Sequence, residues 1–129
     1  MGKKINYNKY RDYAKDLIEM LRRSTERLRF SYNRVAKINL DKATFTDEEL
    51  ETIESLCSRF ARTSDMILQK AFRFLDIWEL EQPDISVIDR IHNAEKRRLI
   101  PDAEEFKYIR ELRNDVAHNY ALDHSEELF

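Results

Sequence analysis

The segment from residue 111 to residue 120, Glu-Leu-Arg-Asn-Asp-Val-Ala-His-Asn-Tyr, holds the side chains best suited to chemistry. Arg113 precedes His118 by five residues, and Asn114 precedes it by four. Histidine exchanges protons near neutral pH, and the fork of an arginine matches the oxygens of a phosphate group. On an ideal helix Asn114 and His118 lie one above the other, whereas Arg113 and His118 are about 140° apart. The segment therefore indicates phosphate chemistry at the end of a helix, with Tyr120 close by.

The spacing of Arg113 and His118 alone also fits a structural role, because the helix dipole favours a histidine near a helix C-terminus. The longer string is more specific. Residues 113–120, Arg-Asn-Asp-Val-Ala-His-Asn-Tyr, resemble the Arg-x4–6-His-x-Tyr motif of the HEPN family. The string is most similar to the small HEPN toxins that are paired with a minimal nucleotidyltransferase (MNT) antitoxin.

This resemblance implies a metal-independent endoribonuclease toxin in which Arg113 and His118 are catalytic and Asn114 supports them. It implies a two-fold homodimer with the motif helices of both chains at one cleft. It also implies that the antitoxin attaches AMP to Tyr120. The end of the chain after Phe129 departs from the family, whose last helix is usually longer.

The implied reaction agrees with the chemistry of these side chains. RNA cleavage requires that the ribose 2′-hydroxyl is deprotonated, the pentacoordinate phosphorus is stabilised and the 5′-oxygen is protonated. A histidine suits both proton transfers, and an arginine suits the developing charge. RNA is therefore the expected substrate, with tRNA as one candidate. An AMP group on Tyr120 would occupy the phosphate site beside Arg113 and repel the RNA.

Three further residues are candidates for support of the site. Asp115 belongs to the motif itself, and Arg62 and Asp65 lie on the long helix that precedes it in the sequence. Arg59, Arg62 and Asp65 follow one another at intervals of three residues, so they share one side of a helix. The plainer interpretation is that they form surface ion pairs.

The scarcity of glycine excludes several classes of enzyme. Glycine occurs once, at Gly2, and proline occurs twice, at Pro83 and Pro101. Gly-rich phosphate loops, dinucleotide-binding fingerprints and nucleophile elbows each need glycine at fixed positions. His92 and His124 have no partners at the spacing of metal ligands, so we expect no metal and no cofactor.

The balance of charge argues against a protein that coats nucleic acid. Lys and Arg number 23, Asp and Glu number 25, and the formal net charge is −2. A local basic site stays open, because several arginines lie close together between residues 22 and 34, although a solvated face is the plainer interpretation. Cys57 is the only cysteine, which fits a cytoplasmic protein without an intrachain disulfide. We interpret it as a small core residue. Because no apolar run approaches the length of a membrane span, we expect no membrane partner.

Apolar residues at helical spacing predict an all-α fold, an antiparallel bundle of four to five helices that forms one domain over residues 1–129. A capping box of Thr46 and Glu49 marks the start of the second helix. Ser86 marks the start of the third helix, and Asp102 with Glu105 that of the fourth. The four main helices are expected over residues 7–36, 46–78, 86–100 and 102–120.

The tail resembles the start of a fifth helix, capped by Asp123 or Ser125, which we interpret as truncated or as ordered only against a partner. The buried stripes are expected to include Leu50 and Trp78 in the second helix and Leu112 in the fourth.

A ribonuclease toxin is not the only function that these features allow. The main alternative is a non-catalytic HEPN-like subunit that binds substrate or serves as a scaffold for a nucleotidyltransferase. A helical adaptor without nucleotide chemistry is a third possibility. Binding to DNA through a helix-turn-helix is disfavoured by the negative charge and by the absence of a glycine-containing turn between two short helices.

Overall fold

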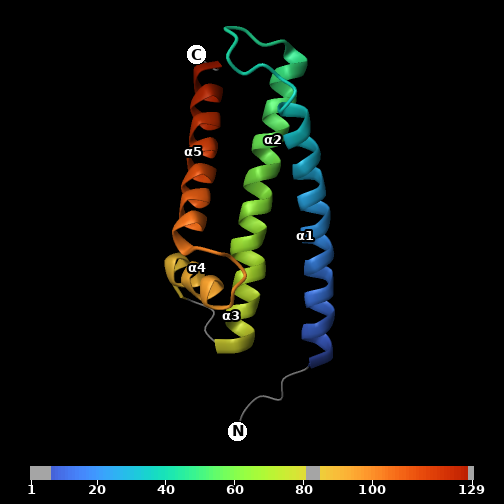
Figure 1. The fold of residues 1–129 in the computed structure, drawn as a ribbon, viewed down its shortest axis with the longest axis vertical. Helices are drawn as coiled ribbons and strands as arrows, with labels where there is room; N and C mark the ends of the chain where they lie inside the picture. Colours follow the sequence, from blue (N-terminus) through green and yellow to red (C-terminus); the bar gives the residue numbers. More distant parts are fainter. Residues whose placement is uncertain (1–6, 81–84, 128–129) are drawn as a thin grey trace.

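The structure, a computed structural model, describes residues 7–80 and 85–127, with the side chains of residue 80 and residues 119–127 outside the description. Every regular element in these ranges is a helix, and no strand is present in them, which confirms the predicted all-α class. Because α2, η1 and α3 follow one another without interruption, the fold has four helices in space (Figure 1). The elements are α1 (Tyr7–Val35), α2 (Asp47–Met66), the π-helical segment η1 (Ile67–Phe72), α3 (Arg73–Leu80), α4 (Val87–Lys96) and α5 (Ala103–Glu127).

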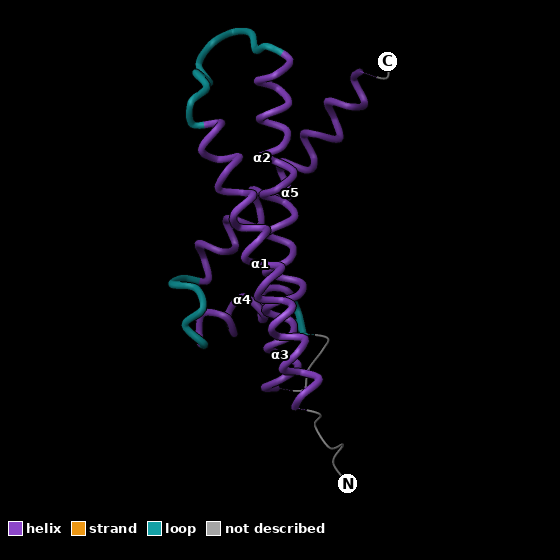
Figure 2. Tube along the Cα trace, turned by 90° about the vertical axis from the view of Figure 1, so that its right-hand side faces the viewer, coloured by secondary structure: helices purple, strands orange, loops and turns teal. Residues whose placement is uncertain are grey.

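The long helix α2–η1–α3 is the centre of the bundle. α1 lies antiparallel along one side of it, α5 lies along the other side, and the short α4 packs near the α3 end (Figure 1). From the side, the C-terminal part of α5 diverges from α2 (Figure 2). The core therefore occupies the lower part of the molecule, where α4 and α5 meet the long helix.

The predicted capping signals act at two helix starts. The Thr46 hydroxyl accepts a hydrogen bond from the Glu49 N–H at 3.1 Å, and the Glu49 carboxylate accepts one from the Thr46 N–H at 2.9 Å, which completes the capping box. Ser86 accepts from the Asp89 N–H at 3.1 Å and caps α4. Both caps satisfy N–H groups that have no partner within their own helix.

The predicted fifth helix is wrong as a separate element. α5 continues from Ala103 to Glu127 without a break, so Asp123 and Ser125 lie within a helix and do not begin one. The physical reason is that residues 103–127 contain neither glycine nor proline, the residues that most strongly end a helix. The motif at residues 113–120 consequently lies within a continuous helix and not at its end.

The hydrophobic core is formed where η1 meets α4 and α5. The rings of Phe72 and Phe106 are 5.2 Å apart between centroids, and Ile91 of the same cluster has no exposed surface. Burial of such side chains stabilises the fold by about 1.5–3 kcal/mol each. The cluster consists of Leu68, Phe72, Ile91, Ala94, Ala103 and Phe106.

Three apolar residues that were expected in the interior are exposed. Leu50 is 43% exposed, Trp78 is 37% exposed and Leu112 is 40% exposed. Leu50 and Trp78 lie near the two ends of the long helix, where fewer helices cover it. Leu112 lies on α5 at a position that the other described helices leave partly open to solvent. Periodicity identifies the apolar side of a helix, but it does not show how far a neighbour extends along it.

A buried carboxylate joins α3 to α4. Asp76 has no exposed surface, and its two oxygens accept hydrogen bonds from Arg90 Nε at 3.1 Å, Arg97 Nη1 at 2.7 Å and Asn93 Nδ2 at 3.3 Å. Arg97 also donates to Glu79 at 2.8 Å. Burial lowers the pKa of the Arg97 guanidinium, but its hydrogen bonds to Glu79 and Asp76 outweigh this effect and raise the pKa above its ordinary value. A buried charge with this many partners holds the two helices in one relative position.

We expect the substitution Asp76→Ala to lower the free energy of unfolding by about 3–5 kcal/mol, because it removes the carboxylate of the buried ion pair with Arg90. Urea unfolding measures the change. The matched substitution Asp16→Ala, at an exposed position of α1, is expected to change the same quantity by less than about 0.5 kcal/mol. A loss below about 1 kcal/mol at Asp76 would show that this cluster contributes little to the fold.

Candidate functional site

Arg113 on α5 faces the long helix and forms an ion pair with Asp65 on α2. Arg113 Nη2 lies 2.7 Å from Asp65 Oδ2, and the two side chains are 30% and 46% exposed. The residues are 48 positions apart in the sequence, so the pair depends on the packing of α5 against α2. The structure thus brings together two of the residues that were singled out from the sequence.

The ion pair borders a pocket between α2 and α5, which we call the Arg113 pocket. Its volume is about 230 Å³, which is enough for a phosphate group with part of a sugar. Its lining combines apolar side chains with hydroxyl, amide, carboxylate and guanidinium groups. The lining residues are Ser64, Asp65, Leu68, Gln69, Phe106, Ile109, Arg110, Arg113 and Asn114.

Arg113 retains hydrogen-bond donors beside this pocket. Its Nη1 lies 3.5 Å from the Asn114 side-chain oxygen, which is at the limit of a hydrogen bond. Its Nε is buried and has no hydrogen-bond partner within the described part of the chain. An unpaired buried donor costs about 1–3 kcal/mol. Because Arg113 also lines the pocket, its guanidinium can serve an anionic ligand there, such as a phosphate or a carboxylate.

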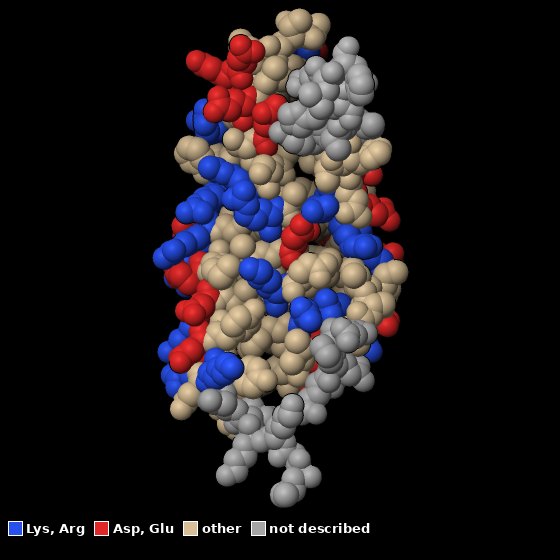
Figure 3. Space-filling view, turned by 180° about the vertical axis from the view of Figure 1, so that it is seen from behind, with Lys and Arg blue, Asp and Glu red and all other residues tan. Residues whose placement is uncertain are grey.

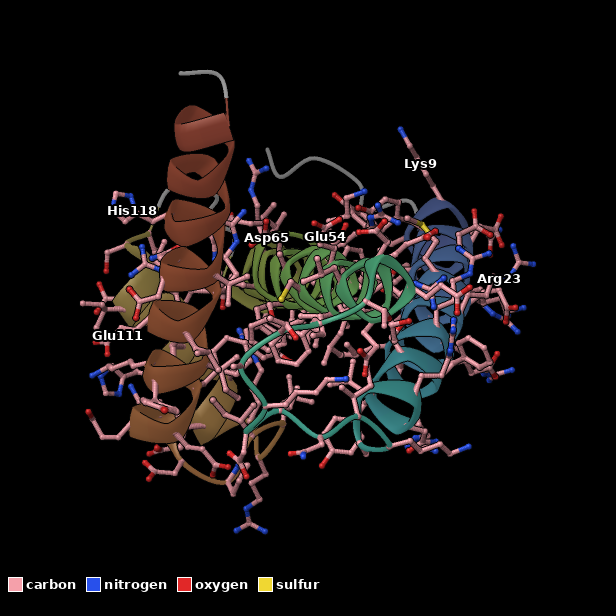
Figure 4. The ribbon with its side chains drawn as sticks, turned by 90° about the horizontal axis from the view of Figure 1, so that it is seen from above. Lys9, Arg23, Glu54, Asp65, Glu111 and His118 are labelled. Atoms are coloured by element: carbon pink, nitrogen blue, oxygen red, sulfur yellow. The ribbon has the colours of Figure 1, made fainter. Side chains whose placement is uncertain are left out.

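His118 lies on the opposite side of α5 from Asp65. Seen from above, its exposed side chain points away from α2, on the same side as Glu111 (Figure 4). The five-residue spacing accounts for this, because five residues rotate a helix by about 140° relative to Arg113. Within one chain the structure does not bring Arg113 and His118 to a common point.

The other predicted site residues lie in three different places. The exposed side chain of Asp115 is on α5, and Arg62 lines a separate groove between α1 and α2. The backbone of Tyr120 belongs to α5, but its side chain falls outside the described part of the structure. Of the candidate supporting residues, Asp65 and Asn114 therefore border the same pocket as Arg113.

Sequence reasoning did not single out Arg110 and Gln69, which also border the Arg113 pocket. A signal was present in both cases. Arg110 precedes Arg113 by three residues, and Gln69 follows Asp65 by four, so each lies one helical turn from a residue already chosen. Asp76 was also missed, although a lone acidic residue among Phe72, Phe74 and Leu75 indicates a buried charge that needs a partner.

The structure offers little support for a thiol nucleophile or a metal centre. Cys57 is partly buried, and burial raises the pKa of its thiol, with the Glu54 carboxylate adding to the effect. The thiolate, which is the nucleophilic form, is thereby disfavoured. Among residues 7–80 and 85–127 no group of three or more His, Cys, Asp or Glu side chains is placed to hold a metal ion. In the same ranges no helix combines the length and apolar character needed to cross a bilayer.

Comparisons with models of protein families, with curated proteins and with solved structures give no match to this chain.

The Asp65–Arg113 pair is expected to contribute little to stability, because both side chains are partly in contact with water. Asp65→Asn should change the free energy of unfolding by less than about 1 kcal/mol, measured by urea unfolding at neutral pH. A loss of more than about 2 kcal/mol would show instead that the pair is a structural anchor like Asp76. The expected small effect makes Asp65 suitable for functional tests, since the variant stays folded.

Proposed function

We propose that this protein is a metal-independent endoribonuclease of the HEPN type, a toxin that cleaves RNA in the cytoplasm, with tRNA as a candidate substrate. The observation that carries the proposal is the Arg113 pocket, in which Arg113 is held by Asp65 at 2.7 Å and still has a buried Nε without a partner among the described residues. A phosphodiester fits a pocket lined by Arg113, because guanidinium forks bind phosphate oxygens in pairs.

In the proposed reaction His118 acts as a general acid–base. It accepts the proton of the ribose 2′-hydroxyl, and the 2′-oxygen forms a bond to phosphorus while the bond from phosphorus to the 5′-oxygen breaks. A protonated histidine returns a proton to the departing 5′-oxygen, which leaves a 2′,3′-cyclic phosphate and a free 5′-hydroxyl. Arg113 stabilises the charge that develops on the phosphoryl oxygens. No metal is required, since the proton transfers and the charge stabilisation come from side chains.

The directions of Arg113 and His118 require a second chain in this proposal. Because His118 points away from the pocket of its own chain, a two-fold dimer through α5 would bring a histidine and an arginine of different chains to one cleft. The exposed apolar residues of α5 support such a contact. Tyr108 is 64% exposed and Leu112 is 40% exposed, and they lie one helical turn apart.

Regulation by a nucleotidyltransferase antitoxin belongs to the same proposal. Tyr120 follows His118 by two residues on α5, and an AMP group on its hydroxyl would place negative charge near the cleft. That charge would compete with the RNA backbone for the guanidinium groups. We propose Tyr120 as the site of AMP attachment, with the MNT enzyme as partner.

Incubation of the purified protein with total tRNA in excess EDTA tests the activity. We expect cleavage to persist in EDTA and to fall by about 100-fold or more in His118→Ala, because general acid–base catalysis contributes about 10²–10⁴ in rate. Arg113→Ala is expected to abolish cleavage and growth inhibition as well. The matched substitution His92→Ala removes a histidine from α4, away from the site, and should retain the activity.

Two results would contradict the proposed activity. One is full cleavage by both His118→Ala and Arg113→Ala, which would place the active site elsewhere. The other is absence of cleavage by wild-type protein whose Tyr120 is shown by mass spectrometry to be unmodified. Tight binding to a nucleotidyltransferase in that second case would support the alternative, a non-catalytic subunit that uses the motif for contacts with its partner.

Co-expression with a minimal nucleotidyltransferase and ATP tests the proposed modification. We expect mass spectrometry of peptides to locate AMP on Tyr120 and to find none in Tyr120→Phe. Tyr108→Phe is the matched control, since Tyr108 is an exposed tyrosine on the same helix. An unmodified Tyr120 under these conditions would exclude it as the acceptor.

A further inference from the structure

Four arginines surround a second hollow, on the opposite side of α2 from the core. This arginine groove lies between α1 and α2 and has a volume of about 210 Å³. Met20 and Met66 supply apolar surface at its edges, and Ser24 supplies a hydroxyl. The arginines are Arg23, Arg27, Arg59 and Arg62.

The arginines of the groove differ in their hydrogen-bond and ion-pair partners. Arg59 Nη1 donates to the Ser31 hydroxyl at 2.8 Å and to the Arg27 carbonyl oxygen at 3.1 Å, so its charge is fixed between the two helices. Arg23 Nε donates to Glu19 at 3.2 Å. Within the ranges that the structure describes, Arg27 and Arg62 have no carboxylate within ion-pair distance. The groove therefore holds uncompensated positive charge in a protein whose net charge is −2.

Lys and Arg side chains are numerous across the middle of one face of the molecule. Seen from behind, they form a group there, with some Asp and Glu among them and at the edges, and a further acidic group lies at the upper end (Figure 3). Such a concentration of like charge on one face attracts a polyanion even when the whole protein is slightly acidic.

The arginine groove and the Arg113 pocket border the same turn of α2. Arg62 lines the groove and Asp65 lines the pocket, and three residues on a helix are one turn apart. An extended polyanion that enters the groove can thus continue across α2 to Arg113. A linear phosphate backbone has the required shape and carries one charge at each phosphate, and arginine forks bind phosphate oxygens in pairs.

From this arrangement we infer that the arginine groove binds the phosphates of single-stranded RNA next to the scissile bond, with Arg27 and Arg62 as the principal contacts. The inference rests on the proposed ribonuclease function for the identity of the strand, but the binding itself needs no cleavage. Arg59 holds the two walls of the groove together, and Arg23 lies at its rim.

Fluorescence anisotropy with a labelled 2′-O-methyl oligouridylate of about 12 nucleotides tests this inference, because this probe cannot be cleaved through a 2′-hydroxyl. The variant is Arg27→Gln/Arg62→Gln, which keeps the aliphatic bulk and leaves Arg59 in place. Two phosphate contacts to a single strand contribute about 1.4 to the slope of log affinity against log salt, so binding in about 0.1 M salt should fall by roughly 20-fold. The slope should become shallower by about 1.4.

The control variant is Arg22→Gln/Arg29→Gln, which removes the same charge from α1 on the side away from the groove. Residues 22 and 29 are rotated by about 100–160° from residues 23 and 27 on an ideal helix. We expect this variant to bind the probe within about twofold of wild type. Thermal unfolding followed by circular dichroism confirms that both variants are folded.

Three outcomes would overturn the inference. Equal losses in both variants would mean that only overall charge matters, and an unchanged affinity in the Arg27/Arg62 variant would mean that RNA binds elsewhere. A third outcome is that a poly-glutamate peptide binds as tightly as the RNA probe and loses affinity to the same extent in the Arg27/Arg62 variant. That result would indicate that the groove binds acidic proteins. The proposed function is tested separately. If it is wrong, tRNA stays intact in the cleavage assay, while the probe still binds and still loses affinity in the Arg27/Arg62 variant.

Discussion

The buried carboxylate of Asp76 determines how the two halves of this fold meet. A charge without exposed surface is tolerated only where donors surround it, and Arg90, Asn93 and Arg97 supply those donors from one short stretch of chain. Because these contacts hold α4 against α3, they also set where α5 begins and how it approaches α2. The position of Arg113 opposite Asp65 is a consequence of that approach. The geometry of the candidate site therefore depends on the charge cluster around Asp76, which is not itself part of the site.

Much of the fold could be predicted because helix starts and apolar stripes are local properties. Thr46 with Glu49 and Ser86 cap their helices as the sequence indicates. The continuation of α5 past residue 120 was missed although the lack of glycine and proline in residues 103–127 favours it. The exposure of Leu112 could not be predicted in this way, because it depends on how far the neighbouring helices extend, and a local pattern contains no information about that distance.

For the candidate site, the sequence identifies the reactive residues better than it identifies their arrangement. Asp65 and Arg113 were chosen separately and are in contact, yet nothing in the spacing of either stretch predicts the pair. The ideal-helix geometry already placed Arg113 and His118 on different sides of one helix, and α5 has this geometry through the whole motif. A reaction that needs both residues therefore depends on whether two chains assemble so that Arg113 of one chain lies near His118 of the other.

The π-helical segment Ile67–Phe72 changes the directions in which the side chains after it point, relative to those before it. A π turn holds about one residue more than an α turn, so a continuous α-helix through the same sequence would rotate Asp76 by about 100° relative to Asp65. The N-terminal half of the helix would still present its arginines to α1 and Asp65 to α5, but Asp76 would face away from α4. The single extra residue thus sets the relative directions of Asp65 and Asp76. A one-residue deletion within 67–72 that restored a regular α-helix would keep these directions, whereas loss of the π turn without a deletion would turn the supporting residue Asp65 away from its present relation to the anchor Asp76.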